Sequence, residues 1–274
     1  MSLDRIRLAS LHDKVMSAEQ AATFIQDGMT VGMSGFTRAG EAKAVPLALV
    51  KQAKENPLKI TLITGASLGN DLDKQLTEAG VLARRLPFQV DNTLRKAINN
   101  GEVMFIDQHL SETVEQMRNL QLKKPDVAII EAIAITEDGG IIPTTSVGNS
   151  ASFAIFAEKV IVEINTNLSP AFEGLHDIYI PSYRPTRQAI PLTQVDERIG
   201  THAINIDPSK IVGIVINNEY HDSPSTVTEP DDETQGIANH LINFFEQEVA
   251  AGRLPKDLGP LQAGIGSIAN AVLT

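Results

Sequence analysis

Four runs of apolar, largely β-branched residues constrain the fold of this chain more than any other feature. The runs are KITLIT (59–64), DVAIIEAIAIT (126–136), KVIVEI (159–164) and KIVGIVI (210–216). Their apolar residues are continuous and do not alternate with polar ones, which is typical of strands buried on both faces of a sheet. Segments with helical patterns separate them. The sequence therefore predicts an α/β fold with a mostly parallel open sheet flanked by helices.

Turn and capping residues predict the remaining elements. IIPT (141–144) should pair with the run 126–136 across Glu137-Asp138-Gly139-Gly140, which is typical of a hairpin. Ser17 and Gln20 form a capping box at a helix start, and Gly252 should close a long helix. We expect further short strands at 29–33 and 103–106, and helices at 45–54, 71–79, 91–100, 112–122 (capped by Ser111) and 234–252. Residues 165–207, rich in proline and polar residues, should be irregular.

Composition excludes several classes of function. The 274 residues carry 23 basic and 34 acidic side chains, a net charge of -11, with no basic block. This balance argues against a nucleic-acid surface and fits poorly with an anionic membrane. The absence of cysteine excludes thiol catalysis, disulfides and thiolate metal sites. No run approaches the ~18 apolar residues of a membrane span, and Met1–Leu11 has no signal-peptide core, so we expect a cytoplasmic protein.

Three glycine-containing loops directly follow predicted strands. They are SGFTRAG (34–40), GASLG (65–69) and TTSVGNS (144–150). In open α/β sheets ligands bind beyond the carboxyl ends of the strands, and such loops offer hydroxyls and backbone N–H groups to phosphate or carboxylate oxygens. Taken singly, each is also an ordinary strand-to-helix turn. Together at one sheet edge they favour a binding site.

Other motifs carry less weight. Gly264–Ala269 fits the dinucleotide pattern G-x-G-x-x-A, but it follows a poor strand and no acidic residue about 20 positions on exists, because the chain ends at Thr274. No P-loop is present. Glu131 and Glu163 lie inside apolar strands, and we favour structural ion-pair members over site groups. We read the six histidines as structural, since none has another at metal-ligand spacing: His12, His109, His176, His202, His221 and His240.

The chain ends in a glycine turn and an apolar helix that begins at Ser267, and no capping signal closes that helix. One reading is a frayed terminal helix. The other is a chain cut inside a larger protein, or one completed by a partner. The apolar residues Ile268, Val272 and Leu273 favour an interface and a homo-oligomer.

Long stretches of the chain closely resemble the acetyl-CoA hydrolase/CoA-transferase family. They are VGMSGFTRAGEAKAVPLAL (31–49), ITGASLGNDLD (63–73), EAIAITEDGGIIPTTSVGNS (131–150), EKVIVEIN (158–165) and GPLQAGIGSIANAV (259–272). The resemblance runs from near Arg5 to Thr274, and the family's proteins, which include succinyl-CoA:acetate CoA-transferases, are about twice as long. It implies that residues 1–258 form one of two similar CoA-transferase-like domains. Residues 259–274 would then begin the second domain or an inter-domain loop and helix that contacts CoA.

The resemblance also implies a mechanism. A glutamate attacks an acyl-CoA such as acetyl-CoA or succinyl-CoA, and a glutamyl-CoA thioester forms that a carboxylate or water resolves. No glutamate here matches the family's nucleophile, which is expected beyond residue 274, so this chain alone should be inactive. Coenzyme A is then a substrate, acetate or succinate the acid, and no permanent cofactor or metal is expected.

Site residues follow from the same resemblance. Gln262, Ala263, Gly264, Ile265 and Gly266 would contact CoA, and the Ile265 backbone N–H would stabilise the oxyanion on the thioester carbonyl. Gly35 and Ser67 would line a small carboxylate pocket. Val90 stands where relatives can carry threonine, which puts the identity of the acid in doubt.

Three alternatives remain open at this point. The chain is one subunit of a heteromeric CoA-transferase, a catalytically silent acyl-CoA or carboxylate-binding module, or a sugar-phosphate isomerase on a similar sheet. The last lacks an evident basic phosphate clamp. Hydrolase and transferase activity both follow from the same intermediate, so the sequence does not separate them.

Overall fold

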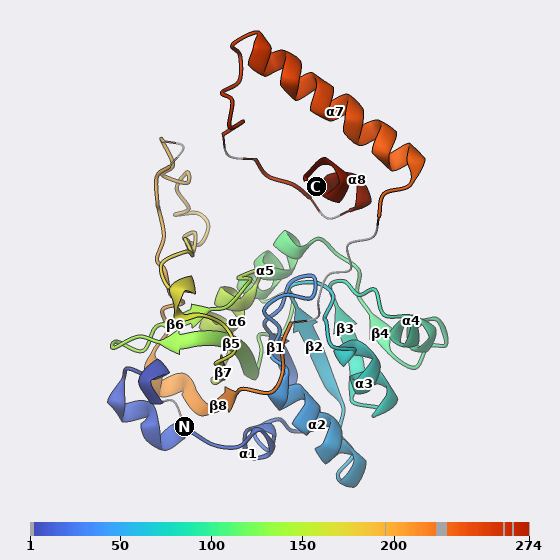
Figure 1. Ribbon diagram of the computed structural model, residues 1–274. Coiled ribbons are helices and arrows are strands. Elements are labelled where there is room, and N and C mark those ends of the chain that lie inside the picture. The colour runs from blue at the N-terminus through green and yellow to red at the C-terminus, as the bar shows by residue number, and fades with distance from the viewer. Residues whose placement is uncertain (1–2, 195, 223–228, 260, 265, 274) are drawn as a thin grey trace. The chain divides into compact units, whose positions relative to one another are not determined.

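A computed structural model describes residues 3–194, 196–222, 229–259, 261–264 and 266–273 (Figure 1). The chain divides into two compact units, Met1–Ser223 and Pro224–Thr274. The first unit contains the sheet, and the described residues of the second unit form two helices. The predicted boundary after residue 258 concerns the domains of a longer protein and stays a prediction.

The first unit is built on one eight-stranded sheet in the order β4-β3-β2-β1-β5-β7-β8, with β6 paired to β5 alone. All neighbouring pairs along this order are parallel, and only the β5–β6 pair is antiparallel. The predicted mostly parallel sheet and its hairpin are therefore confirmed. The strands are β1 Thr30–Met33, β2 Ile60–Thr64, β3 Leu82–Leu86, β4 Met104–Phe105, β5 Val127–Ile135, β6 Ile141–Pro143, β7 Lys159–Asn165 and β8 Ile211–Asn217.

Six α-helices of the described chain accompany this sheet. They are α1 Ala18–Ala22, α2 Ala44–Glu55, α3 Leu72–Glu78, α4 Asn92–Asn99, α5 Leu110–Arg118 and α6 Ser150–Phe156. The capping box of Ser17 and Gln20 opens α1 as predicted. The predicted cap of α5 is wrong: His109 holds the N-cap position and Ser111 lies in the first turn. The reason is that the His109 carbonyl already accepts from the Glu112 and Thr113 N–H groups, at 3.1 and 3.3 Å.

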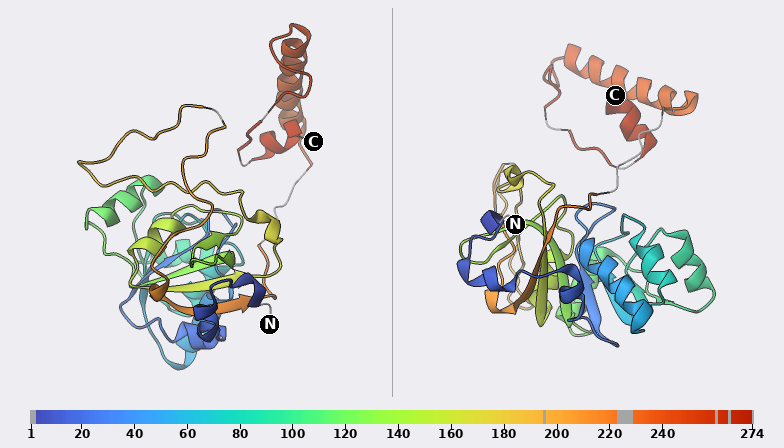
Figure 2. Two further views of the ribbon diagram at one scale, coloured as in Figure 1. Left: turned by 90° about the vertical axis from the view of Figure 1, so that its left-hand side faces the viewer. Right: turned by 60° about the horizontal axis from the view of Figure 1, so that its bottom comes forward.

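Successive residues of the central strands are buried on opposite faces of the sheet. Ile129 and Ile161 belong to the cluster that includes α1 and α2, whereas Ile130 and Val162 pack in the cluster that includes α6. Figure 2 shows helices on either side of the sheet. This two-sided burial explains why β5 and β7 are continuously apolar.

The connection from β7 to β8 is irregular, as predicted for 165–207. Short 3-10 turns at Pro170–Phe172 and Pro208–Lys210 are its only helical pieces among the residues described. In the second unit, α7 runs from Asp232 to Ala250 and α8 from Ser267 to Leu273. Gly252 follows α7 with φ +70°, as a closing glycine should.

Candidate functional site

The three glycine loops that follow β1, β2 and β6 do meet at the carboxyl edge of the sheet. The Arg38 N–H donates to the Ser67 carbonyl at 3.5 Å, and the Ser146 hydroxyl donates to the Ala39 carbonyl at 2.7 Å. A Cβ on Gly65 would lie 2.5 Å from the Gly35 carbonyl oxygen. The first loop thus packs directly against the other two, as the sequence led us to expect.

The predicted carboxylate-pocket residues differ in their surroundings. Gly35 is buried with φ +127°, and a Cβ there would lie 2.7 Å from the Glu41 Cβ, so only glycine fits. Ser67 is buried close by, whereas Val90 is 41% exposed. An open cavity of about 590 Å³ lies at the same edge and is lined by residues that include Phe36, Thr37, Ala66, Phe88, His109 and Glu112. Gly35, Ser67 and Val90 are not among its lining residues.

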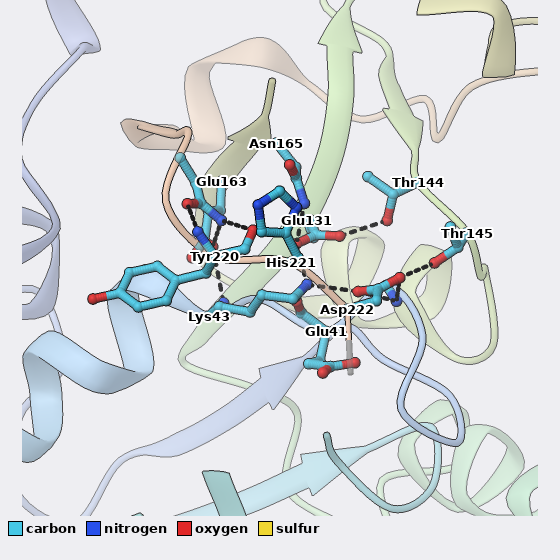
Figure 3. Close-up of polar contacts among 12 residues, drawn as sticks. Glu41, Lys43, Glu131, Thr144, Thr145, Glu163, Asn165, Tyr220, His221 and Asp222 are labelled. Atoms are coloured by element: carbon cyan, nitrogen blue, oxygen red, sulfur yellow. Dashed lines mark hydrogen bonds and ion pairs between the residues drawn. The ribbon is translucent and has the colours of Figure 1, made fainter. Parts of the chain in front are cut away.

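A buried ammonium group lies beneath these loops (Figure 3). Lys43, just before α2, places its Nζ 2.6 Å from Glu131 Oε2 and 2.8 Å from Asp222 Oδ1. The Lys43 and Glu131 side chains are both 0% exposed. Lys43 Nζ also donates to the Glu41 carbonyl at 2.7 Å. All three donor positions of the ammonium are therefore used, which compensates its desolvation.

Glu131 lies in the middle of β5 and accepts hydrogen bonds from three groups. Besides Lys43, they are the Thr144 hydroxyl at 2.8 Å and the Asn165 amide at 3.2 Å. Burial, together with the charge of neighbouring Glu163, raises the pKa of the Glu131 carboxyl to about 7, although the charge of Lys43 lowers it. The prediction that Glu131 belongs to an ion pair is confirmed.

Glu163 caps the start of α2 across the fold. It stands opposite Glu131 in the β5–β7 register, and its carboxylate accepts from the backbone N–H groups of Lys43, Ala44 and Val45 at 2.8, 2.9 and 3.1 Å. Burial raises the pKa of Glu163, and these N–H bonds oppose the rise. The Asn217 side-chain amide also donates to Glu163 Oε1, at 3.2 Å. The described partners of Glu163 are thus a helix N-terminus, where an anion is stabilised, and one neutral amide, and its predicted role as an ion-pair member is corrected accordingly.

Reasoning from the sequence missed Lys43, Glu41 and Asp222. The only signal for Lys43 was a lone charge in an apolar run, AKAVPLAL. Glu41 is fully buried: its Oε1 accepts from the Asn70 amide at 3.0 Å, and its Oε2 has no hydrogen-bond partner among the described residues. Burial raises the pKa of the Glu41 carboxyl above its usual range.

The predicted CoA-contacting loop lies in the second unit. Gln262, Ala263, Gly264 and Gly266 are exposed and line a cavity of about 510 Å³ whose other lining residues include Leu241, Phe245 and Ile268. A Cβ on Gly264 would meet no atom within 4 Å. Ile265, the predicted oxyanion donor, lies outside the described residues.

Two of the histidines have backbone partners. His12 Nε2 lies 2.8 Å from the Ile6 carbonyl oxygen, and His176 Nε2 lies 2.9 Å from that of Thr144. Within the described ranges no three His, Asp or Glu side chains form a group able to hold a metal ion. No described helix is long and apolar enough to cross a membrane.

Known proteins show the same sequence pattern. Residues 2–216 match the acetyl-CoA hydrolase/transferase N-terminal domain. The chain is 45% identical to the succinyl-CoA:acetate CoA-transferase of Clostridium kluyveri and 43% identical to the acetyl-CoA hydrolase of Schizosaccharomyces pombe. Each alignment covers 98% of this chain but only 50% and 53% of the relative. The chain thus spans about half the length of the curated relatives it matches.

Solved structures share the fold. RipA from Yersinia pestis aligns with a TM-score of 0.64 at 18% identity, covering 96% of this chain and 54% of that one. Glutaconate coenzyme A-transferase from Acidaminococcus fermentans aligns with a TM-score of 0.51 at 16% identity, covering 75% of this chain and 76% of that one. At such low identity these likenesses speak for the architecture alone.

Proposed function

The chain belongs to the acetyl-CoA hydrolase/transferase family, and from this premise we propose that it is the amino-terminal half of an acyl-CoA:carboxylate CoA-transferase or acetyl-CoA hydrolase. One observation carries the proposal: the chain aligns over 98% of its length with one half of a transferase and of hydrolases. Acetyl-CoA or succinyl-CoA would be the donor, and acetate or succinate the acid. A cytoplasmic location is part of the same proposal.

The proposed reaction proceeds through a glutamate of the missing half. Its carboxylate oxygen attacks the thioester carbon, and CoA leaves as the thiolate, which gives a mixed anhydride. The thiolate then attacks the glutamyl carbonyl, releases the acyl group as a free carboxylate and leaves a glutamyl-CoA thioester. An acceptor carboxylate reverses these steps, whereas water hydrolyses the thioester. In support, Glu131 and Glu163 are buried and bonded to internal donors, so neither carboxylate is free to attack a substrate.

Two regions of the chain would then bind the two substrates, one the small carboxylate and the other the CoA part of the acyl-CoA. We assign Gly35, Ser67 and Val90 to the small carboxylate, and residues 262–266 to CoA. The meeting of the Gly35 and Ser67 loops at the carboxyl edge supports the first assignment, and the exposure of Gly264 and Gly266 supports the second. The Ile265 N–H would donate to the oxygen that gains charge during attack, where a donor fixed in advance stabilises the transition state.

The proposal is tested by exchange of labelled acetate into acetyl-CoA. The 274-residue chain should show none, while the longer protein of which it is half should exchange label and form a borohydride-reducible glutamyl thioester. In that protein Gly264→Val and Gly266→Val should lower kcat by about 10²–10³, the usual effect of losing one oxyanion donor. Gly236→Val in α7, which also has open space around its Cβ position, is the matched control and should leave kcat near wild type. Transfer by the short chain alone would overturn the mechanism.

A further inference from the structure

The segment after β8 is tied to four separate loops of the sheet edge. We call residues 218–222 the strap. The Tyr220 carbonyl accepts from Asn167, which follows β7, at 3.2 Å, and the His221 carbonyl accepts from Asn70, which follows β2, at 3.0 Å. The Asp222 carboxylate reaches the loops that follow β1 and β6. The strap therefore lies across the carboxyl ends of the strands, where ligands bind in open α/β sheets.

Asp222 makes the most contacts of the strap residues with the candidate pocket loops. Its carboxylate accepts from the Thr145 hydroxyl at 2.8 Å and from the Gly40 N–H at 3.4 Å, and it pairs with Lys43 at 2.8 Å. Its side chain is only 22% exposed, so these contacts are largely shielded from water. Gly40 ends the loop that begins at Gly35, and a Cβ there would lie 2.6 Å from Ser146 Oγ. One carboxylate thus fixes the relative position of two loops.

The Lys43–Asp222 ion pair belongs to a buried group of charges, so the loss of Asp222 would leave Lys43 with fewer partners. Glu131 and Asp222 bind the ammonium directly, and Glu41 and Glu163 face it from the loop after β1 and from β7. Burial alone would lower the pKa of Lys43, but the carboxylates of Glu131 and Asp222 hold it above the usual value. Lys43 therefore stays charged, and without Asp222 one of its hydrogen-bond directions would be empty in a buried place.

We propose that Asp222 is a positioning residue for the candidate carboxylate pocket, holding loops 34–43 and 144–149 in place from the strap. The strap is also the covalent route from the first unit into the second, so the pocket loops are connected through Asp222 to the chain that carries residues 262–266. Naming these loops a carboxylate pocket rests on the proposed function. The mechanical link between Asp222 and the loops does not.

Hydrogen exchange on the 274-residue chain tests this link without any acyl-CoA. Asp222→Ala should speed amide exchange in residues 36–43 and 144–149 by about tenfold, the effect of losing roughly one net hydrogen bond, while amides of β5 and β7 keep the wild-type rate. Asp222→Asn keeps an oxygen that accepts from Thr145 or Gly40, and should restore most of the protection. Glu219→Gln, which removes an exposed carboxylate of the same strap, is the matched control and should behave as wild type.

Several results would overturn the proposal. They are faster exchange confined to residues 218–222, equal acceleration in β5 and β7, or no difference between Asp222→Ala and Glu219→Gln. If Asp222→Ala does not fold, Asp222→Asn carries the test, and it should still loosen both loops more than Glu219→Gln does. Failure here would leave the proposed CoA chemistry standing, because that chemistry is judged by the acetate-exchange assay.

Discussion

Two regions of the molecule differ in how many of their contacts lie within their own unit. One is the cluster of Lys43, Glu131 and Asp222 in the first unit, and the other is the glycine loop of residues 262–266 in the second unit. Lys43 and Glu131 have fully buried side chains with hydrogen-bond partners on every side. Around the glycine loop, Leu261 is 53% exposed, Ile268 42% and Leu273 60%. The first region therefore has its geometry fixed within its own unit, whereas the second presents apolar surface of the kind that marks a contact site.

This difference indicates a division of labour. A region with internal partners keeps its shape in the isolated chain, and its changes should appear as changes in stability. A region with exposed glycines and exposed apolar side chains contributes little to the stability of the isolated chain. Its substitutions should therefore change association, and the activity of the proposed longer protein.

The largest effect should come from removing the buried cation. Lys43→Met leaves Glu131 and Asp222 without their shared partner, so we expect a loss of about 3–5 kcal/mol in the free energy of unfolding. Ile268→Lys in α8 should change it by no more than about 0.5 kcal/mol, as surface substitutions do. Urea unfolding followed by circular dichroism measures both. Equal losses from the two variants would contradict the comparison.

Stability should fall as pH rises from about 4.5 to about 7. Glu131 titrates near 4.5 when unfolded and at about 7 when folded, so the folded protein binds the extra proton between these values and loses that advantage above them. The full effect is on the order of 3 kcal/mol. Glu131→Gln should make this part of the stability curve less steep, although the raised pKa values of Glu41 and Glu163 keep a fall of the same sign, and Glu197→Gln on the surface should not change the slope. A curve that rises over this range in wild type would contradict the assignment.

Two glycine substitutions should differ because one glycine is enclosed and the other is not. Gly35→Ala places a Cβ 2.7 Å from the Glu41 Cβ at φ +127°, and we expect a cost of about 1–3 kcal/mol from crowding and strain. Gly264→Ala meets nothing within 4 Å and should leave the free energy of unfolding unchanged. Thermal unfolding of both variants gives the comparison, and a tolerated Gly35→Ala would argue against a rigid first loop.

Substitutions of apolar residues in α8 should have the smallest effect on the free energy of unfolding and a clear effect on self-association. We expect the isolated chain to self-associate through the exposed apolar residues of α7 and α8, and Ile268→Lys and Val272→Lys should shift it toward monomer with little loss of stability. Sedimentation velocity over a concentration series measures this. A wild-type chain that stays monomeric at high concentration would remove the reason to regard this surface as a contact site.

Much of the fold followed from the sequence because its signals are local. The apolar runs predicted β5, β7 and β8, and the capping box at Ser17 predicted the start of α1. Each of these signals lies within the element that it predicts. The cap of α5 failed because the chain enters that helix at His109, before the serine that looked like its cap. The sequence predicted that the three glycine loops lie at the same edge of the sheet, but it did not predict which of their residues are in contact.

The charged cluster could not be assembled from the sequence because its members are far apart along the chain. Lys43 directly precedes α2, Glu131 lies in the middle of β5 and Asp222 follows β8, and nothing near Asp222 in the sequence marks it as the partner of a buried cation. The role of Glu163 as a remote cap of α2 depends on the register of β5 and β7, which the sequence does not give. Pairing between distant segments is thus the information that the structure adds.

The most direct test of the account is complementation. The 274-residue chain and a separately produced carboxy-terminal half of the proposed longer protein should each fail to exchange labelled acetate into acetyl-CoA, and the mixture should regain exchange. The Ile268→Lys chain should regain less at equal concentration, because its contact surface is weakened. Exchange by the 274-residue chain on its own would contradict this mechanism. So would a mixture of the two halves that shows no exchange while the continuous protein is active.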